Sequence, residues 1–397
     1  MQATELPLYM RRNGFEPAPE LTALRDGDGV GKVITPFGTE AWLVTRFADV
    51  RAVLADWERF SNARAQLFAR PDMADLTPEE IAEQRAGNLL GFDPPDHTRL
   101  RRMLMPEFTV KRMKRLQPRV EEIVEDHLDA MERAGAPADL VQAFALPVPS
   151  LVICELLGVP YADRADFQSR SGRLLDVSLP MAERMAARNE MRAYMRELVT
   201  RAQAGPGDDL IGMLIREHGD DLATSELIGI ANLLLIAGHE TTSNMLGLGT
   251  LALLRHPGQL AKLRADPELI EPAVEELLRW LSIVHSGTAK VATADVEVGG
   301  QTIPEGDLVM LALPTANRDP ELVEDPDRLD LARGAAGHAA FGHGLHHCLG
   351  APLARMEMRT AFPALLNRFP GLRAVDDDAH FRSFHVVYGL TEFQVAW

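Results

Sequence analysis

Residues 226–255 have the pattern of one long helix that is apolar on nearly every side, and this segment constrains the fold more than any other. At a rise of 1.5 Å per residue, about thirty residues reach roughly 45 Å, which is enough to cross a bilayer. His239 and Glu240 lie at the middle, where an ionisable pair is costly in lipid but natural in a helix that lines a functional cavity. We therefore predict a long central helix enclosed by protein and ended by His256-Pro257.

The segments around this helix predict a mainly α fold with small β-sheets. Helical periodicity dominates from about residue 95 to residue 255. Strands are expected in three hairpins, namely 30–34 with 41–45, 295–303 around a Gly-Gly turn, and 385–388 with 392–395. Because the chain shows no repeat and no low-complexity linker, we expect a single domain over residues 1–397.

Charge and cysteine content exclude several classes of protein. Acidic residues outnumber basic ones by 58 to 41, so the net charge of −17 disfavours binding to nucleic acid or to an anionic membrane. The N-terminus has no apolar core of a secretory signal, so we expect no membrane association. The two cysteines, Cys154 and Cys348, cannot form a disulfide framework, which favours a cytoplasmic location.

Cys348 lies in a glycine-rich run that leads directly into a helical pattern at about 352–368. Backbone N–H groups and the positive end of the helix dipole favour a thiolate at such a position, and thiolate is the form that binds metal. An ordinary buried cysteine in a tight turn explains this run equally well. Zinc is less favoured, because the neighbouring His346 and His347 point apart and no second ligand pair follows at the usual spacing.

The central helix carries a second chemical pattern. One stripe of this helix is formed by Leu234, Ala237, Gly238, Thr241 and Met245, which leaves a notch of small residues beside a hydroxyl. Thr241 next to Glu240 pairs an alcohol with a carboxylate, and such a pair can deliver protons through water to a bound reactant. A helix–helix crossing that uses small residues is the alternative interpretation.

Two residue pairs have the spacing of helix neighbours. Glu276 and Arg279 are three residues apart, which alone indicates a salt bridge on one helix face. His97 and Arg101 are four residues apart, and both could donate to an anion on the same side of a helix. Neither pair identifies a function by itself.

Taken together and in this order, these patterns resemble the cytochrome P-450 superfamily, in particular the soluble bacterial, actinomycete-like haem-thiolate monooxygenases. The resemblance runs from about residue 15 to the end. The haem loop F-x-x-G-x-H-x-C-x-G is matched at every fixed position, by Phe341, Gly344, His346, Cys348 and Gly350. The oxygen-activating motif A-G-x-E-T-T matches 237–242, and the E-x-x-R clamp matches Glu276 and Arg279, with Arg328 as its expected third member.

The resemblance implies a haem b that lies between the long helix and the cysteine loop. Cys348 is then the axial thiolate ligand of the iron, while Ala237, Gly238, Phe341, Gly344 and Gly350 border the haem. His97, Arg101 and His346 are the expected donors to its propionates. Lys290 stands where soluble relatives commonly have an arginine, which keeps the charge but loses the bidentate geometry.

The implied reaction inserts one oxygen atom from O2 into a medium-sized or large hydrophobic small molecule, by hydroxylation or epoxidation. Such chemistry is typical of secondary metabolism or xenobiotic conversion. Thr241 and Glu240 are the expected catalytic residues, which deliver protons to dioxygen. The substrate pocket is expected to be walled by Leu234, Ile283, Val284 and Val387 and roofed by 67–88 and 167–195.

Electrons must come from another protein, because the chain has no nucleotide-binding motif. The resemblance implies NAD(P)H as the source, through a ferredoxin reductase and a ferredoxin. Residues 99–119 hold eight basic side chains against the single acid Glu107, which stands out on an acidic chain. We expect this segment to dock an acidic ferredoxin, with a merely solvated helix face as the alternative.

Three other functions remain open from the sequence. A haem-thiolate oxidase that couples phenols would share every motif named above. A haem sensor without turnover would bind the cofactor but form no product. A helical protein that binds an apolar ligand without haem would be colourless.

Overall fold

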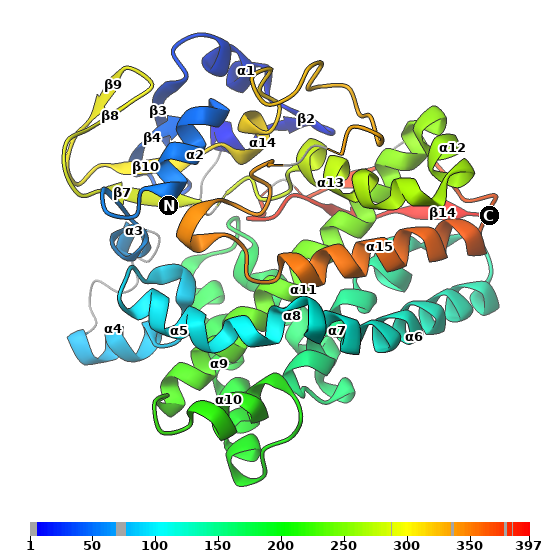
Figure 1. Cartoon of the computed structure of the whole chain (residues 1–397), viewed down its shortest axis with the longest axis horizontal. Coiled ribbons are helices and arrows are strands. Elements are labelled where there is room, and N and C mark those ends of the chain that lie inside the picture. Colours follow the sequence, from blue (N-terminus) through cyan, green and yellow to red (C-terminus); the bar gives the residue numbers. More distant parts are fainter. Residues whose placement is uncertain (1–5, 69–76, 287, 335–336, 377–378, 383) are drawn as a thin grey trace.

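The computed structural model describes residues 6–68, 77–286, 288–334, 337–376, 379–382 and 384–397, and it confirms a mainly α fold with small β-sheets (Figure 1). The helices are α1 Pro19–Asp26, α2 Phe47–Ala55, α3 Asn62–Phe68, α4 Pro78–Arg85, α5 Asp96–Leu104, α6 Val110–Ala134, α7 Pro147–Leu157, α8 Arg164–Leu175, α9 Met181–Ala204, α10 Leu210–His218, α11 Thr224–Arg255, α12 Pro257–Ala265, α13 Ile270–Leu281, α14 Leu313–Ala316 and α15 Ala351–Arg368. The strands are β1 Arg12–Asn13, β2 Glu16–Pro17, β3 Val30–Ile34, β4 Glu40–Val44, β5 Phe60–Ser61, β6 Ala138–Asp139, β7 Ala289–Ala292, β8 Val296–Val298, β9 Gln301–Ile303, β10 Leu308–Leu311, β11 Arg373–Ala374, β12 His380–Phe381, β13 Leu390–Glu392 and β14 Gln394–Ala396.

The predicted long helix is α11, which spans 32 residues and packs against α7, α9 and α15. Its first turn is stabilised by Glu226, whose side chain accepts a hydrogen bond from the backbone N–H of Ala223 at 3.0 Å. It ends where Pro257 begins α12. Among the described residues no helix is long and apolar enough to cross a membrane.

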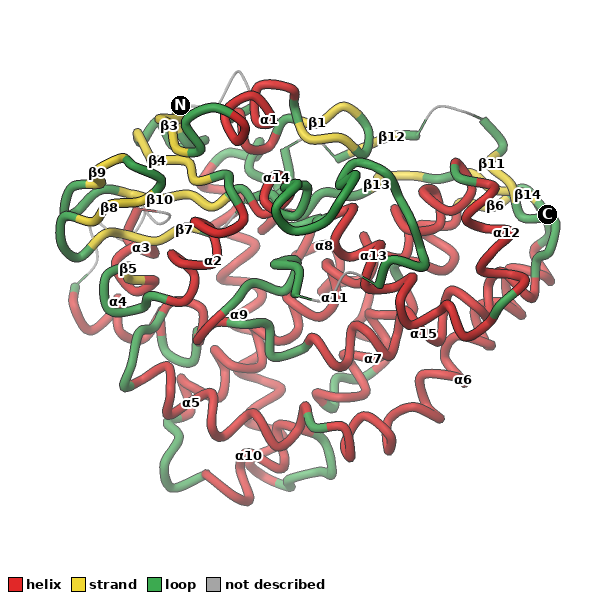
Figure 2. Tube along the Cα trace, turned by 45° about the horizontal axis from the view of Figure 1, so that its top comes forward, coloured by secondary structure: helices red, strands yellow, loops and turns green. Residues whose placement is uncertain are grey.

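The largest sheet joins strands from residues 30–61 to strands from residues 289–311 (Figure 2). Its strand order is β3-β4-β10-β7-β5, and β4 and β10 are parallel neighbours. The predicted hairpin of β3 and β4 is confirmed, with Val30 opposite Val44. The predicted hairpin of β8 and β9 is also confirmed, and Gly299 and Gly300 turn it with φ of 55° and 80°, which side chains with a Cβ rarely adopt.

The predicted C-terminal hairpin of 385–388 with 392–395 is wrong. His385 pairs with Asp176, and Val387 pairs with Val284. Strand β13 instead pairs with β12, while β14 lies between β11 and β6. These strands are too short for their alternation to identify a partner. The bridge partners of His385 and Val387 also lie more than a hundred residues earlier in the chain.

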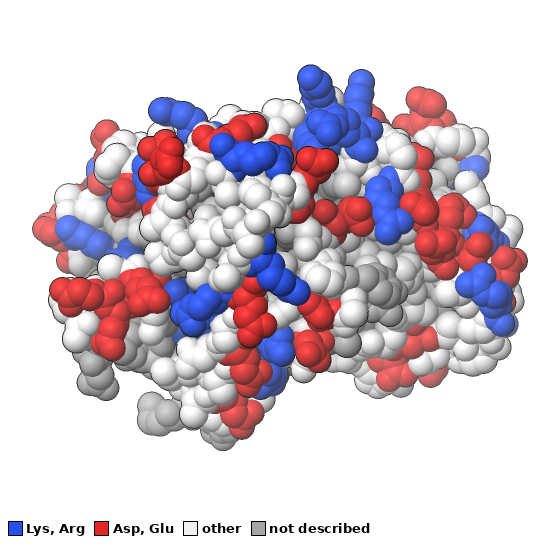
Figure 3. Space-filling view, turned by 90° about the horizontal axis from the view of Figure 1, so that it is seen from below, with Lys and Arg blue, Asp and Glu red and all other residues white. Residues whose placement is uncertain are grey.

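On one face of the molecule, side chains of both charge signs lie in small groups (Figure 3). On the face that Figure 3 shows, acidic and basic residues alternate, and no extended field of one sign covers that face. Beneath the surface, a core of apolar side chains joins α6, α7, α9, α11 and α15, and a smaller cluster lies against the main sheet. The helical core therefore positions α11 and α15, on which the candidate site is built.

Candidate functional site

The loop that carries Cys348 is held in place by its backbone. The N–H of Cys348 donates to the carbonyl of Phe341 at 2.9 Å. Gly344 has a φ of 69°, and a Cβ there would lie 2.9 Å from the Cα of Ala55 in α2. This glycine is therefore required for close packing of the loop on α2.

The thiol of Cys348 lies directly before α15. Burial raises the pKa of this thiol, while hydrogen bonds from the backbone of Gly350 and the charge of Arg101 act in the opposite direction. Yet the side chain is accessible, unlike that of Cys154. The sulfur can therefore be reached from outside the protein, as a thiol that binds a metal must be.

Helix α11 has one accessible stripe, although the helix runs through the middle of the molecule (Figure 1). Ala237 is exposed and Thr241 is half-buried, whereas the intervening His239 and Glu240 are buried. Leu234, which is partly buried, is on the same stripe. The predicted notch therefore exists, but Gly238 does not face it, because a Cβ at Gly238 would lie 2.8 Å from the side chain of Ile153 in α7. That glycine belongs to a helix crossing.

Four buried or half-buried nitrogen-bearing side chains are close enough to influence one another. His97 and Arg101 come from α5, Lys290 from β7 and His346 from the cysteine loop. The rings of His97 and His346 are 4.2 Å apart. Burial, reinforced by these positive neighbours, lowers the pKa of His97 to about 4 and that of His346 to about 3, and burial lowers the pKa of Lys290 to about 8.

This cluster lacks an anionic partner of its own. No ring nitrogen of His97 or His346 has a hydrogen-bond partner among the described residues. Asp93, the acid that acts on both His97 and Lys290, is already bound by the Ser61 hydroxyl and by the backbone N–H of Asn62 at 2.9 Å. Buried donors without partners are costly, so the residues present fit the two carboxylates of a haem.

Two members of the cluster have protein partners. Arg101 donates to the carbonyl of His347 at 2.7 Å, which ties α5 to the cysteine loop. Lys290 donates to Oδ1 of Asn62 at 2.6 Å. The sequence did not indicate Asn62, because nothing in its surroundings marks a partner more than two hundred residues away in the chain.

Glu276 forms the centre of a buried clamp. Both of its carboxylate oxygens accept hydrogen bonds at 2.8 Å from Arg279, and Oε1 also accepts from Nε of Arg333 at 3.2 Å. The prediction of Arg328 as the third member is wrong, since its side chain is 63% exposed and pairs with Asp330. The sequence could not show whether Arg328 or Arg333 contacts Glu276, because the path of the loop decides which side chain turns inward.

The carboxylate of Glu240 has partners that the sequence did not suggest. Its Oε2 accepts a hydrogen bond at 3.1 Å from Arg382, and its Oε1 lies 3.5 Å from Nδ1 of His239. The neighbouring Thr241 hydroxyl donates to the carbonyl of Ala237 at 2.7 Å. Glu240 and Thr241 are thus both held in defined orientations.

The predicted wall residues are only partly brought together. Val284 pairs with Val387, and the carbonyl of Ile283 accepts from the N–H of Tyr388 at 2.8 Å, so these segments lie side by side. Leu234 and Val284 both pack against the apolar cluster that contains Ile283 and Val387. Of the predicted roof, residues 69–76 lie outside the described residues.

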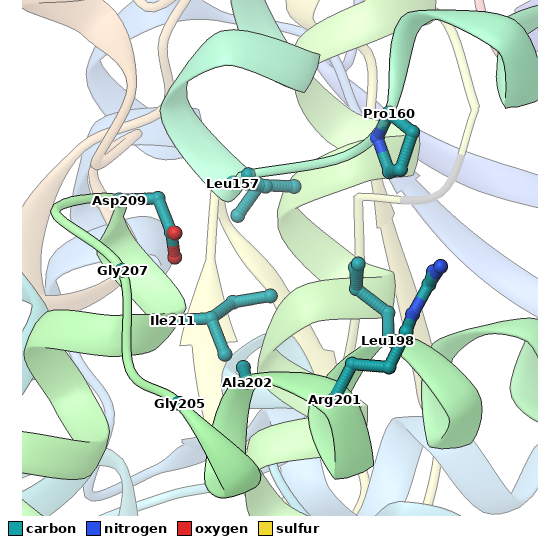
Figure 4. Close-up of a pocket in the computed structure, with 10 residues that line it drawn as sticks. Leu157, Pro160, Leu198, Arg201, Ala202, Gly205, Gly207, Asp209 and Ile211 are labelled. Carbon is teal, nitrogen blue, oxygen red and sulfur yellow. The ribbon is translucent and has the colours of Figure 1, made fainter.

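A separate pocket of about 270 Å³ lies between α7, α9 and the start of α10 (Figure 4). It is lined by Leu157, Leu198, Arg201, Asp209 and Ile211, among others. None of its lining residues belongs to the surroundings of Cys348 or to the stripe on α11. It therefore adds nothing to the candidate site.

Helices α13 and α15 are joined by an ion pair near the cysteine loop. Glu275 accepts hydrogen bonds from Arg355 at 2.7 and 2.8 Å and lies 3.3 Å from His338. Although burial opposes ionisation, these two partners lower the pKa of Glu275 to about 2. The pair fixes α15, whose first residues support Cys348.

We expect Glu275→Gln to lower stability at neutral pH but not in acid. A carboxyl whose pKa falls on folding stabilises the protein above its unfolded pKa of 4.5, and this contribution is lost as the pH falls toward 2. Because the side chain is partly exposed, the difference at pH 7 is about 1–2 kcal/mol. Urea unfolding of both proteins at pH 7 and at about pH 2 measures it, and a difference that does not shrink at the lower pH would contradict this assignment.

Comparisons with known proteins agree with this geometry. The family model "Cytochrome P450" matches residues 42–379. Cytochrome P450 FAS1 of Rhodococcoides fascians is 53% identical and covers 99% of both chains, and pentalenic acid synthase of Streptomyces avermitilis is 46% identical over 96% of this chain and 95% of its own. The crystal structure of CYP105P1 with filipin I has a TM-score of 0.90 at 41% identity and covers 98% of this chain and 97% of its own. The chain therefore belongs to the cytochrome P450 family.

Proposed function

We propose that this cytochrome P450 monooxygenase hydroxylates or epoxidises a medium-sized or large hydrophobic small molecule of secondary metabolism. The observation that carries the proposal is the accessible stripe on α11, where Ala237 and Thr241 lie open beside the buried acid Glu240. The aliphatic segments at Val284 and Val387 supply an apolar wall, which is typical of sites for hydrophobic ligands. Relatives named pentalenic acid synthase and vitamin D3 dihydroxylase support this substrate class.

Proteins of this family use haem, dioxygen, a small-molecule substrate and electrons that come from NAD(P)H through redox partners. In this chain Cys348 would bind the iron, and His97, Arg101, Lys290 and His346 would hold the propionates. Bound in this way, haem supplies the iron centre at which dioxygen is activated.

The protein contributes orientation and proton supply. The Thr241 hydroxyl can turn from the Ala237 carbonyl and donate its proton toward dioxygen, because the side chain borders the accessible stripe. Glu240, one residue away, can replace that proton through water. Helix α11 is buried on the side away from the accessible stripe, so bulk solvent does not reach Glu240 and Thr241 from there. Protons are then expected to enter through Glu240.

The test is turnover with a surrogate ferredoxin, ferredoxin reductase and NADPH under ¹⁸O2, with vitamin D3 as the probe, and a mass gain of one ¹⁸O supports the proposal. A product that has lost two hydrogens and gained no oxygen would support an oxidase that couples phenols, when a bisphenolic probe is used instead. If no product forms from either probe and NADPH is not consumed, a haem sensor without turnover is the better interpretation.

We expect Thr241→Ala to separate electron use from product formation. Without the hydroxyl, proton delivery to dioxygen is no longer directed by this side chain. Product per NADPH therefore falls by about tenfold or more, while hydrogen peroxide rises. Product, peroxide and NADPH are measured together. Thr242→Ala is the matched control, because Thr242 is buried one position off the stripe. Unchanged coupling in Thr241→Ala would reject the assigned role.

We further propose an acidic ferredoxin as the redox partner. Only some of the basic side chains in 99–119 are available to dock it. Of the basic side chains in 99–119, Arg99, Arg112 and Arg119 form ion pairs with acids, and Arg101 turns toward the cysteine loop. Four basic side chains are exposed without an ion pair among the described residues, and these are Arg102, Lys111, Lys114 and Arg115. The exposed apolar Met105 and Val110 lie in the same stretch of the chain. Exposed apolar side chains combined with charged ones are typical of a transient docking surface.

We expect Arg115→Glu to slow reduction by ferredoxin by roughly tenfold at low salt, because a rim charge mainly affects association. The difference is expected to shrink at high salt. Arg201→Glu carries the same charge change on α9 and is the control. Stopped-flow reduction measures both, and equal rates for Arg115→Glu and the control would exclude this surface. Dependence on such a partner also favours a cytoplasmic location, in which the free thiols of Cys154 and Cys348 stay reduced.

A further inference from the structure

We propose that Arg382 is a positioning residue for the proton supply of this enzyme: its ion pair with Glu240 holds that carboxylate in a fixed orientation and connects it to solvent. The inference rests on the proposed function in one respect, namely that Glu240 delivers protons during turnover. The ion pair itself is a property of the fold and can be tested without turnover.

The contact is built between two distant elements. Glu240 lies in the middle of α11 and is 3% exposed, whereas Arg382 lies between β12 and β13 and its side chain is 19% exposed. The guanidinium donates from Nη1 to Oε2 at 3.1 Å. Arg382 therefore touches the buried acid with one end and reaches solvent with the other.

Other groups near Glu240 do not replace this cation. His239 on α11 lies 3.5 Å from the carboxylate, but burial lowers the pKa of His239, so its ring is neutral at physiological pH. His385, on the same segment as Arg382, interacts electrostatically with both Glu240 and Asp176, and burial lowers its pKa too. Phe167 of α8 covers the ring of His239 with an apolar edge. Arg382 is thus the charged partner of Glu240 among the described residues.

The backbone of the segment 380–392 keeps Arg382 in place. The N–H of Arg382 donates to the carbonyl of Gly389 at 2.9 Å. Further along, Val177 and Phe384 are joined by a backbone hydrogen bond of 2.9 Å, which ties the segment to the end of α8. The same segment carries Val387 of the proposed substrate wall. The position of Arg382 is therefore set by the elements that enclose the substrate.

The proton balance of this arrangement is simple. A guanidinium keeps its own protons, so Arg382 does not carry the proton. A proton from bulk solvent passes through water at Arg382 to the Glu240 carboxylate, and Glu240 passes a proton through water to the Thr241 hydroxyl. That hydroxyl gives up its own proton to dioxygen that has been reduced by electrons from the redox partner. The ion pair re-forms when Glu240 is ionised again, which returns the relay to its starting state.

The experiment compares Arg382→Gln with Arg382→Lys in the haem-loaded enzyme. During turnover with surrogate ferredoxin and NADPH, we expect the share of electrons recovered as hydrogen peroxide to rise by about three- to tenfold in Arg382→Gln, with a larger solvent isotope effect. Arg382→Lys keeps a cation and is expected to recover part of the wild-type coupling. Arg373→Gln, an exposed arginine of β11 without an ion pair among the described residues, is the control.

The second measurement needs no turnover. Thermal unfolding of wild type, Arg382→Gln, Glu240→Gln and the double variant forms a cycle, in which we expect Arg382→Gln to lower the Tm clearly in the wild type and little in the Glu240→Gln background. An equal loss of Tm in both backgrounds would assign Arg382 to the segment rather than to Glu240 and would overturn the proposal. Unchanged peroxide formation in Arg382→Gln would overturn it as well. Absence of any NADPH consumption in the wild type would instead contradict the proposed function, while the cycle would still report on the ion pair.

Discussion

Cys348→Ser is expected to abolish the strongly red-shifted Soret band of the reduced, carbon monoxide-treated protein and to eliminate turnover. The band depends on electron donation from an axial thiolate, and a serine hydroxyl is neither ionised nor soft enough to replace it. The effect is expected to be complete, because the other cysteine of the sequence, Cys154, is buried in α7. Difference spectra of protein expressed with added haem measure it.

Cys154→Ser is the matched control, since it makes the same chemical change at the other free thiol. We expect this variant to keep the red-shifted band. A band retained in Cys348→Ser would show that another group binds the iron. A band that is absent from folded, haem-supplied wild type would contradict the whole interpretation of the cysteine loop.

Glu276→Ala is expected to have the largest effect on stability, about 3–5 kcal/mol, because it leaves buried guanidinium groups without their carboxylate. Glu276 and Arg279 are completely buried, and Arg333 reaches the same acid. The loss also frees the backbone N–H of Asp330, which donates to Glu276 at 3.1 Å. Urea unfolding at pH 7 measures the change, and Glu276→Gln serves if the alanine variant does not fold.

Two arginine variants decide which side chain completes the clamp. Arg333→Ala is expected to cost about 1–3 kcal/mol, because it removes a buried charged hydrogen bond. Arg328→Ala is expected to stay within about 0.5 kcal/mol of wild type, since the side chain is exposed. The reverse order would restore Arg328 as the third member of the clamp.

Local patterns in the sequence predicted the helices and tight turns of this protein, but not the contacts between residues that are far apart in the chain. The apolar periodicity of α11 and the Gly-Gly turn between β8 and β9 are properties of neighbouring residues, so both could be predicted. The partners of His385 and Val387 could not, because a strand of one or two residues carries too little pattern to select Asp176 or Val284. Pairing at such sites is decided by packing of the whole chain.

The same limit applies to the candidate site. Cys348, His97 and Arg101 occupy positions that a motif fixes, and the structure places His97 beside His346. By contrast, Arg382 has no motif, and its contact with Glu240 joins residues 142 positions apart. The sequence shows that segment 99–119 is basic. Its net charge does not show that several of its arginines form ion pairs with acids elsewhere. Charge counts cannot show which side chains remain available.

The main sheet pairs strands from the first part of the chain with strands made much later, and this has a consequence for biosynthesis. Strands β3 to β5 belong to the first part of the chain, whereas β7 and β10 are made much later, and the loop before Cys348 must then dock against α2. Such distant pairings are slow to form, since a long loop has to close before they contribute. A nascent chain therefore leaves the ribosome with its helices largely made and its cofactor site still unassembled. Haem supply is needed after synthesis is nearly finished, and a cell that overproduces this protein faster than it makes haem is expected to accumulate a folded but colourless fraction.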